Sequence, residues 1–457
     1  MKKIYLLFTL LAIGAAELLQ AQTTIPIFDN VLFFDGYAAR VDTPPAPAGV
    51  IRQRNDLYSV KLTDLQLGQI GTSLRMNVTI KASCDNYDRI GNVNLAFVPK
   101  GDTTYHPDSV NRIEIARYIT PFMNKNRTPD TVPYTYDIAN VAHLLKETSI
   151  TTDYDVWVEL QVFGVPYAAN NEVAGCAGRN DVFYGSIDFV TSGTLAPESN
   201  NVLMPLNFQK ELNNYAAGAS DSVGLTRRTI TFNVDQDLTD AVFVLITSNH
   251  GANNGGEEYN RRQHYVYFDG NQVLTYKPGR TSCEPFRVYN TQGNGIYGPS
   301  PRSDAQWQSF SNWCPGDVID TRIIPLGPVT TGSHTFVINV PNAQFAGGQG
   351  YFPVSLYLQG KTSGNVPVPV SVKRVDESTN LEVYPNPAQS QLTIKTEGTQ
   401  DPQATISIKN ILGQTVLRTK APATENIVNI SQLPAGVYTL VYESKKGSKH
   451  KKVLITK

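Results

Sequence analysis

Val156-Trp-Val-Glu-Leu-Gln-Val-Phe163 places an apolar side chain at every second position. Side chains of a β-strand point alternately to opposite faces, so this run predicts a strand with one face in a hydrophobic core. Similar short runs recur on both sides of it, at residues 74–80, 93–98, 228–234 and 354–358. A helical spacing of apolar residues is found at 138–146. The pattern as a whole predicts an all-β chain of antiparallel strands.

The length of 457 residues is too great for one domain. Residues 22–195 and 200–360 each contain enough short runs for one antiparallel β-sandwich. A stretch rich in Pro and Val, followed by polar and charged residues, predicts a linker at 361–380. Residues 381–457 return to short alternating runs and predict a third, smaller β-sandwich.

The first 21 residues have the features of a secretory signal peptide. Lys2 and Lys3 precede a short apolar run, and Ala21 supplies a small residue for cleavage. No other segment is apolar enough to cross a bilayer, so no transmembrane segment is expected. The net charge of −1 gives no reason to expect a nucleic-acid partner. These features predict an exported protein.

Four cysteines, an even number in an exported chain, predict two disulfides, with three possible pairings. We favour Cys283–Cys314, because both residues lie in one loop-rich stretch. That bond would close a loop of roughly thirty residues and contribute about 3–4 kcal/mol in the chain-entropy account. Cys84 and Cys176 then form the second pair. The cysteines lack metal-ligand spacing and the histidines are scattered, so no metal or other cofactor is expected.

A polar loop, Asn249–His264, lies between two apolar β-runs. Its Asn and Gly residues let the backbone bend tightly and come close to a ligand. Glu257 and Glu258 follow the bend, and an aromatic ring and hydrogen-bond donors come directly after them. Acid, flat ring and donors together predict a site for a sugar-bearing substrate. The alternative is a solvated loop of ordinary polar residues.

Other fragments extend this interpretation. Cys84-Asp-Asn-Tyr-Asp-Arg89 joins a cysteine, an aromatic ring and an Asp-Arg pair, and Trp313-Cys-Pro-Gly316 joins an indole to a cysteine. With Arg117–Phe122, the Glu258 loop and Thr321-Arg-Ile323, these motifs resemble, in their order, the peptide-N-glycosidase F family. The resemblance covers about residues 70–360. It implies two eight-stranded jelly rolls side by side. It also implies a secreted amidase that cuts between the first N-acetylglucosamine of a glycan and an asparagine side chain.

The resemblance assigns roles position by position. It makes Asp88 the primary catalytic acid, Glu258 the second carboxylate and Glu159 a supporting one, the last fixed only by the strand pattern and its distance from the cysteine motif. Amide hydrolysis needs an activated water and a proton for the leaving nitrogen, and two carboxylates in different environments can divide these tasks. We expect the substrate-binding residues to be Tyr87, Arg89, His250, Tyr259, Arg262 and Trp313.

Structural roles compete with these assignments. Asp88 and Arg89 could form a surface ion pair, although we expect Arg89 to keep the carboxylate of Asp88 ionised. Glu159 could be an outward-facing strand residue, and Trp313 could pack over the Cys283–Cys314 bond. The family's arginine three residues before its Trp-Cys-Pro-Gly motif is replaced by Phe310, and Arg302 is the nearest arginine upstream. That departure leaves the preferred class of N-glycan open.

The C-terminal segment carries a second resemblance. Tyr384-Pro-Asn-Pro387, Leu433-Pro-Ala-Gly-Val-Tyr438 and the basic tail ending at Lys457 are similar to the C-terminal sorting domain of the type IX secretion system. The resemblance implies recognition by that machinery, export through the outer membrane and removal of the tail at the cell surface. The protein would then be secreted or attached to the surface. A sugar-binding accessory module is the alternative.

The leading hypothesis is a monomeric, secreted peptide-N4-(N-acetyl-β-glucosaminyl)asparagine amidase that acts on N-glycosylated proteins or glycopeptides. The alternative is a glycan-binding protein with the same fold that does not cut. Copper monooxygenases also pair two jelly rolls, but their sites need clustered histidines and a methionine. The histidines of this chain are isolated in the sequence, so we reject copper chemistry.

Overall fold

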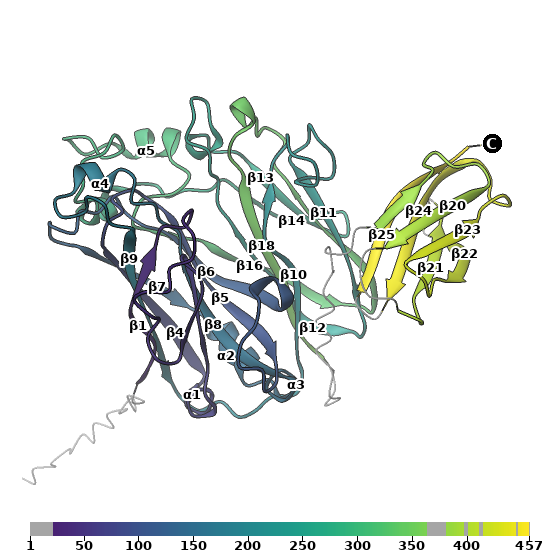
Figure 1. The fold of residues 1–457 in the computed structure, drawn as a ribbon, viewed down its shortest axis with the longest axis horizontal. Helices are drawn as coiled ribbons and strands as arrows, with labels where there is room; N and C mark the ends of the chain where they lie inside the picture. The colour runs from purple at the N-terminus through teal and green to yellow at the C-terminus, as the bar shows by residue number, and fades with distance from the viewer. Residues whose placement is uncertain (1–21, 363–380, 397–400, 411–414, 445–446, 457) are drawn as a thin grey trace, which may run out of the picture.

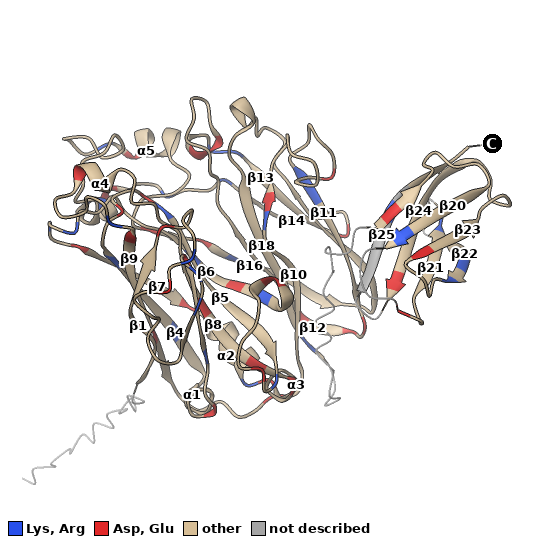
Figure 2. Cartoon of the chain, viewed as in Figure 1, with Lys and Arg blue, Asp and Glu red and all other residues tan. Residues whose placement is uncertain are grey.

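The computed structural model describes residues 22–362, 381–396, 401–410, 415–444 and 447–456 (Figure 1). The expected signal peptide and all but the first two residues of the expected linker lie outside these ranges. The described chain is all-β, with six antiparallel sheets and a few short helices. Figure 2 shows acidic and basic residues interspersed over the sheets rather than gathered in one region.

Residues 23–192 fold into two facing sheets, with strand orders β1-β9-β4-β7 and β6-β5-β8-β3-β2. Leu74, Met76, Val78 and Ile80 of β4 are fully buried while their neighbours on the other face are not, which confirms the expected alternation. The elements are β1 Thr23–Phe34, β2 Val50–Arg54, β3 Leu57–Lys61, α1 Asp64–Gln69, β4 Ser73–Ala82, β5 Ile90–Pro99, β6 Asn111–Ile119, β7 Thr131–Asp137, α2 Ala139–Leu145, α3 Thr148–Asp153, β8 Tyr154–Val162, α4 Ala169–Glu172 and β9 Asp181–Ser192.

Residues 201–362 fold into a second pair of sheets, ordered β10-β18-β12-β16 and β11-β17-β13-β14, around a separate core that includes Phe243 and Phe336. Together with the first unit, this is the paired jelly-roll architecture that the resemblance implied. The elements are β10 Asn201–Leu212, β11 Arg227–Val234, β12 Leu238–Thr247, β13 His264–Phe268, β14 Asn271–Tyr276, α5 Asp304–Phe310, β16 Thr321–Val329, β17 Gly332–Asn339 and β18 Phe352–Thr362.

One short strand crosses from the second unit to the first. β15, Val318–Ile319, pairs antiparallel with β6 and puts Val318 opposite Tyr118. The second half of the chain therefore completes an edge of the first unit's sheet. β15 lies within the expected second sandwich and joins it to the first.

A buried ion pair also joins the two units. Arg117 on β6 is fully buried and donates from Nε and Nη2 to both carboxylate oxygens of Glu114, at 2.7 Å each. Its Nη1 donates to Ser248 Oγ at 2.9 Å and to the carbonyl of Pro353 at 2.8 Å. The hydroxyl of Ser355 donates to Glu114. Because buried charges need a full set of partners, this cluster favours one relative position of the two sandwiches.

Residues 381–456 form a third, smaller pair of sheets, β19-β20-β23 and β22-β21-β24-β25, with a core of its own (Figure 1). The strands are β19 Leu381–Tyr384, β20 Gln391–Thr396, β21 Thr405–Lys409, β22 Thr415–Lys420, β23 Glu425–Asn429, β24 Gly436–Ser444 and β25 Gly447–Ile455. Both expected disulfides are present, Cys84–Cys176 in the first unit and Cys283–Cys314 in the second.

Candidate active site

Asp88 lies in the loop between β4 and β5, and neighbouring segments hold this loop in place. Asp85 is fully buried and accepts a hydrogen bond from the backbone N–H of Val165 at 2.7 Å. The hydroxyl of Thr120 accepts from the backbone N–H of Arg89 at 2.7 Å. The loop is therefore tied to two other segments of the first unit, and the position of the Asp88 backbone is fixed.

Arg89 does not pair with Asp88 as expected. Its Nε donates to Asp85 Oδ2 at 2.6 Å, and its Nη2 donates to Asp85 Oδ1 at 3.3 Å. Burial and the nearby charge of Glu258 raise the pKa of Asp88 to about 8, against a smaller lowering by Arg89. The expectation that Arg89 keeps Asp88 ionised is thus corrected, because Asp85 neutralises the guanidinium. A pKa of about 8 favours the protonated form of Asp88 at neutral pH.

Glu258 sits where the polar loop turns back on itself, in the short 3₁₀ turn Glu257–Tyr259. The backbone N–H of Gly251 donates to Glu258 Oε2, and the N–H of Glu258 donates to the carbonyl of Gly251, both at 3.3 Å. A Cβ on Gly256 would lie 2.0 Å from the Gly251 carbonyl oxygen, so only glycine fits there. Asn312 donates to the carbonyls of Glu257 and Glu258 at 2.6 and 2.7 Å. The glycine at position 256 is therefore needed for the loop to fold back on itself.

Asp88, Glu258 and Tyr259 form one group of interacting side chains. Burial raises the pKa values of Asp88 and Tyr259, and the charge of Glu258 acts in the same direction on both. Burial also raises the pKa of Glu258, and the Gly251 N–H and, to a lesser extent, Tyr259 oppose that rise. Asp88 comes from the first unit and Glu258 from the second. The charge of Glu258 therefore acts on Asp88 across the two jelly rolls.

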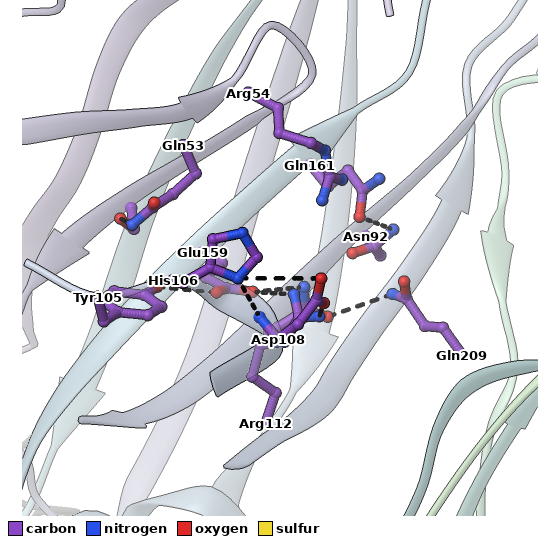
Figure 3. A network of polar contacts seen from close by, with 12 residues as sticks. Gln53, Arg54, Asn92, Tyr105, His106, Asp108, Arg112, Glu159, Gln161 and Gln209 are labelled. Carbon is purple, nitrogen blue, oxygen red and sulfur yellow. Dashed lines mark hydrogen bonds and ion pairs between the residues drawn. The ribbon is translucent and has the colours of Figure 1, made fainter. Parts of the chain in front are cut away.

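Glu159 lies in another network of polar contacts, with Tyr105 and Arg112 (Figure 3). It lies on β8 opposite Asn94, four residues and ~13 Å along β5 from the Ile90 end nearest Asp88. It is fully buried and accepts hydrogen bonds from Tyr105 at 2.8 Å, Asn94 at 3.1 Å and Arg112 at 3.2 Å. Glu159 is thus the centre of a separate polar network, and its supporting role in the site stays a prediction. The alternative of an outward-facing, solvated Glu159 does not hold, because this residue is fully buried.

The expected aromatic residues differ in exposure. Tyr87 is 42% exposed, and its ring lies 5.5 Å from the ring of Phe122, so it is open to a ligand. Tyr259 is half-buried, with one ring face against Phe310. Trp313 is only 8% exposed, and its Nε1 donates to the carbonyl of Asn249 at 2.9 Å. Trp313 packs in the interface between the two units, so its indole face is not free to stack on a sugar.

Two other expected binding residues have structural partners. The Nε2 of His250 lies 2.7 Å from the hydroxyl of Ser248. Burial and the charge of Arg117 lower the His250 pKa to about 3, so the ring is neutral. Arg262 donates from Nε and Nη2 to the buried carboxylate of Glu257, at 2.8 and 2.9 Å. Arg262 therefore stabilises the loop that carries Glu258, and its guanidinium is already neutralised.

Sequence reasoning missed the residues that position the carboxylates. Asp85 neutralises Arg89, Thr120 holds the Asp88 loop, and Asn312 holds the Glu258 loop. Each lies inside or beside a recognised motif, so the signal was present. The motifs did not show which members act on the backbone rather than on substrate.

A protonated carboxyl beside a second carboxylate is suited to acid–base catalysis. Two such groups at short range share protons, and their environments drive their pKa values apart. Burial and the Glu258 charge raise the pKa of Asp88 to about 8, whereas the rise that burial causes in the pKa of Glu258 is opposed by the Gly251 N–H and by Tyr259. The pair therefore offers a proton donor and a proton acceptor on the two sides of one site.

Comparison with known protein families agrees with this architecture. Residues 24–177 match the model for "Peptide-N-glycosidase F, N terminal", and residues 219–359 match "Peptide-N-glycosidase F, C terminal". Residues 382–456 match "Secretion system C-terminal sorting domain". The chain belongs to the peptide-N-glycosidase F family and carries a C-terminal sorting domain of type IX secretion. That domain directs the protein to the cell surface or beyond.

Solved structures of PNGF-II show the same fold at low sequence identity. PNGF-II is 20% identical with a TM-score of 0.53, and the match covers 74% of this chain and 65% of that one. PNGase F, a glycosylasparaginase from Flavobacterium meningosepticum, is 16% identical with a TM-score of 0.47, covering 76% and 97%. This chain thus spans about two thirds of PNGF-II. No curated protein matches by sequence. In the described residues, no helix is long and apolar enough to span a membrane.

Proposed function

We propose that the protein is a secreted amidase that releases N-linked glycans from asparagine side chains. The observation that supports this most directly is the pKa of Asp88, which burial and the charge of Glu258 raise to about 8. In the proposed reaction, water attacks the side-chain amide carbon of the glycosylated asparagine. The carbon–nitrogen bond then breaks, leaving aspartate on the peptide and an amine on the sugar.

The two carboxyls divide the proton transfers. Glu258, in its ionised form, takes a proton from the attacking water, and protonated Asp88 gives its proton to the leaving nitrogen. Tyr87 is exposed beside the site and offers a ring on which a sugar can stack. Arg89, neutralised by Asp85, contributes hydrogen-bond donors without ionising Asp88.

The test is incubation of the full chain with a denatured N-glycoprotein and with a synthetic glycopeptide. We expect conversion of the glycosylated asparagine to aspartate, detected by peptide mass spectrometry, together with free glycan. Saturable binding of the glycopeptide without any conversion would instead establish the glycan-binding alternative. A binder gains nothing from a carboxyl held protonated beside a second carboxylate, so we favour the enzyme.

A further inference from the structure

A second exposed tyrosine lies on the opposite side of the Asp88 loop from Tyr87. β5 follows this loop and pairs with β6 on one side and with β8 on the other. The ring of Tyr87 packs against Phe122, which follows β6, with the ring centroids 5.5 Å apart. The ring of Tyr37 packs against Phe163, which follows β8, with the centroids 5.2 Å apart. Two pairs of rings therefore flank the loop that carries Asp88.

Buried side chains hold the loop that carries Tyr37, between β1 and β2, in one shape. Arg52 is 7% exposed and donates to the carbonyls of Val41 and Pro44. The Nδ2 of Asn55 donates to three carbonyls earlier in the loop at 2.9 to 3.3 Å, and its Oδ1 accepts from the N–H of Val41 at 2.8 Å. Releasing the loop would leave these buried groups without partners. The Tyr37 ring is therefore presented in a fixed position.

Tyr37 also lies close to the part of the sheet that carries the site. The N–H of Gly36 donates to the carbonyl of the residue after Phe163 at 2.9 Å, and a Cβ on Gly36 would lie 2.7 Å from the Phe163 ring. Only glycine lets the loop approach this far. The N–H of Phe163 donates to the carbonyl of Ile90, two residues after Asp88, at 3.4 Å. Tyr37 can therefore contact a part of the substrate that lies beyond the bond to be cut.

The two sides of the Asp88 loop differ in how open they are. On the β6 side the second unit covers the chain, because β15 pairs with β6 and Asn290 accepts a hydrogen bond from the N–H of Phe122 at 2.9 Å. On the β8 side, Tyr37 is 81% exposed. Burial raises the pKa of Tyr351 in the second unit, and Tyr37 and Glu258 add to that rise, so both lie near its hydroxyl. A substituent that leaves the site past Tyr37 has solvent beside it.

We propose that Tyr37 binds a mannose of the N-linked glycan, beyond the two sugars nearest the asparagine. The inference rests on the proposed function, because it takes the bond to be cut beside Asp88. The C–H face of a sugar can stack on the exposed tyrosine ring, which Phe163 supports. A branched glycan needs an open side of the site, whereas a peptide needs only the width of one strand. Tyr37 then adds affinity for glycans that carry the mannoses.

The experiment compares Tyr37→Ala and Tyr37→Phe on two glycopeptides with the same peptide, one with the first two sugars alone and one with the three core mannoses added. On the longer glycan, Tyr37→Ala should raise KM about five-fold and leave kcat unchanged, because a contact remote from the reacting bond binds substrate and transition state alike. On the two-sugar glycopeptide it should match wild type. Tyr37→Phe keeps the ring and Tyr167→Ala removes an equally exposed tyrosine, so both should match wild type on both substrates. An equal rise of KM on the two glycopeptides would overturn the glycan assignment and place the peptide on Tyr37.

A binding measurement separates this proposal from the proposed reaction. The free five-sugar core is titrated by calorimetry into the full wild-type chain and into Tyr37→Ala, and circular dichroism checks that both are folded. Weaker binding by Tyr37→Ala supports the assignment even if wild-type protein cleaves no glycopeptide, a result that would overturn only the proposed function. Equal affinities, or no binding by wild-type protein, would overturn the assignment of Tyr37 whether or not glycopeptides are cleaved.

Discussion

At the scale of single residues, the proposed reaction depends on the proton that Asp88 gives to the leaving nitrogen. Asp88→Asn keeps the shape of the side chain but supplies no acid, so we expect kcat/KM to fall by about 10³-fold or more, equivalent to about 4 kcal/mol of transition-state stabilisation. The measurement is glycopeptide turnover by chromatography. Asp108→Asn, at an exposed position, is the matched control. Wild-type turnover by Asp88→Asn, with an unchanged circular dichroism spectrum, would rule out the assigned role.

The same proton makes stability depend on pH. The pKa of Asp88 in the folded protein, about 8, lies above its ordinary value, so the folded state binds this proton more tightly than the unfolded state does. The stabilisation is complete below the ordinary pKa and is lost as the pH rises through about 8. Between pH 5 and 8 the melting temperature of wild type should therefore fall more than that of Asp88→Asn. Parallel melting curves of the two proteins across this range would contradict the raised pKa.

Glu159 should matter for folding and not for chemistry. It is buried among Tyr105, Asn94 and Arg112, away from Asp88, so Glu159→Gln removes a charge from a satisfied network. We expect a loss of about 1–3 kcal/mol in the free energy of unfolding. Turnover per folded molecule should stay near wild type. Urea unfolding and kinetics on the same preparation test both parts, and a large fall in kcat at full stability would return Glu159 to the site.

At the scale of elements, the buried ion pair on β6 holds hydrogen bonds that cross to the second sandwich. Arg117→Met leaves Glu114 buried without its partner, and we expect a loss of about 3–5 kcal/mol in unfolding free energy. Adding Glu114→Leu removes the orphaned charge, so the double variant should recover part of that loss. Urea titrations of the single and double variants measure the difference. A double variant that is less stable than Arg117→Met alone would contradict this account.

The elements also show what alternation and motifs predict and what they do not. Alternation identified β4 and β8, and helical spacing identified α2, because local burial sets both periods. Alternation showed which face of β8 carries Glu159. It did not show how far Glu159 lies along the strand from Asp88, because the register of β8 with β5 sets that distance. The two residues of β15 are too few to show a period. Arg89 pairs with Asp85 rather than with the adjacent Asp88, and tertiary packing decides that choice.

For the whole molecule, the separate core of residues 381–456 suggests that export and catalysis occupy different parts of the chain. Deletion of residues 381–457 should leave the protein in the periplasm, while the melting temperature of the remaining chain stays near wild type. Immunoblots of periplasmic, surface and culture fractions test the first part, and calorimetry tests the second. Export of the truncated chain to the surface would show that the sorting domain is dispensable.

β15 has a consequence for the order of synthesis. Its residues pair with β6 across about two hundred positions of the chain, so that edge of the first sheet stays open until the ribosome has made most of the second half. Such distant pairings form slowly. If the gene is split near residue 198, each of the two fragments should thus need the other in order to fold. The N-terminal fragment would expose an unpaired strand edge, a template for aggregation when it is made alone.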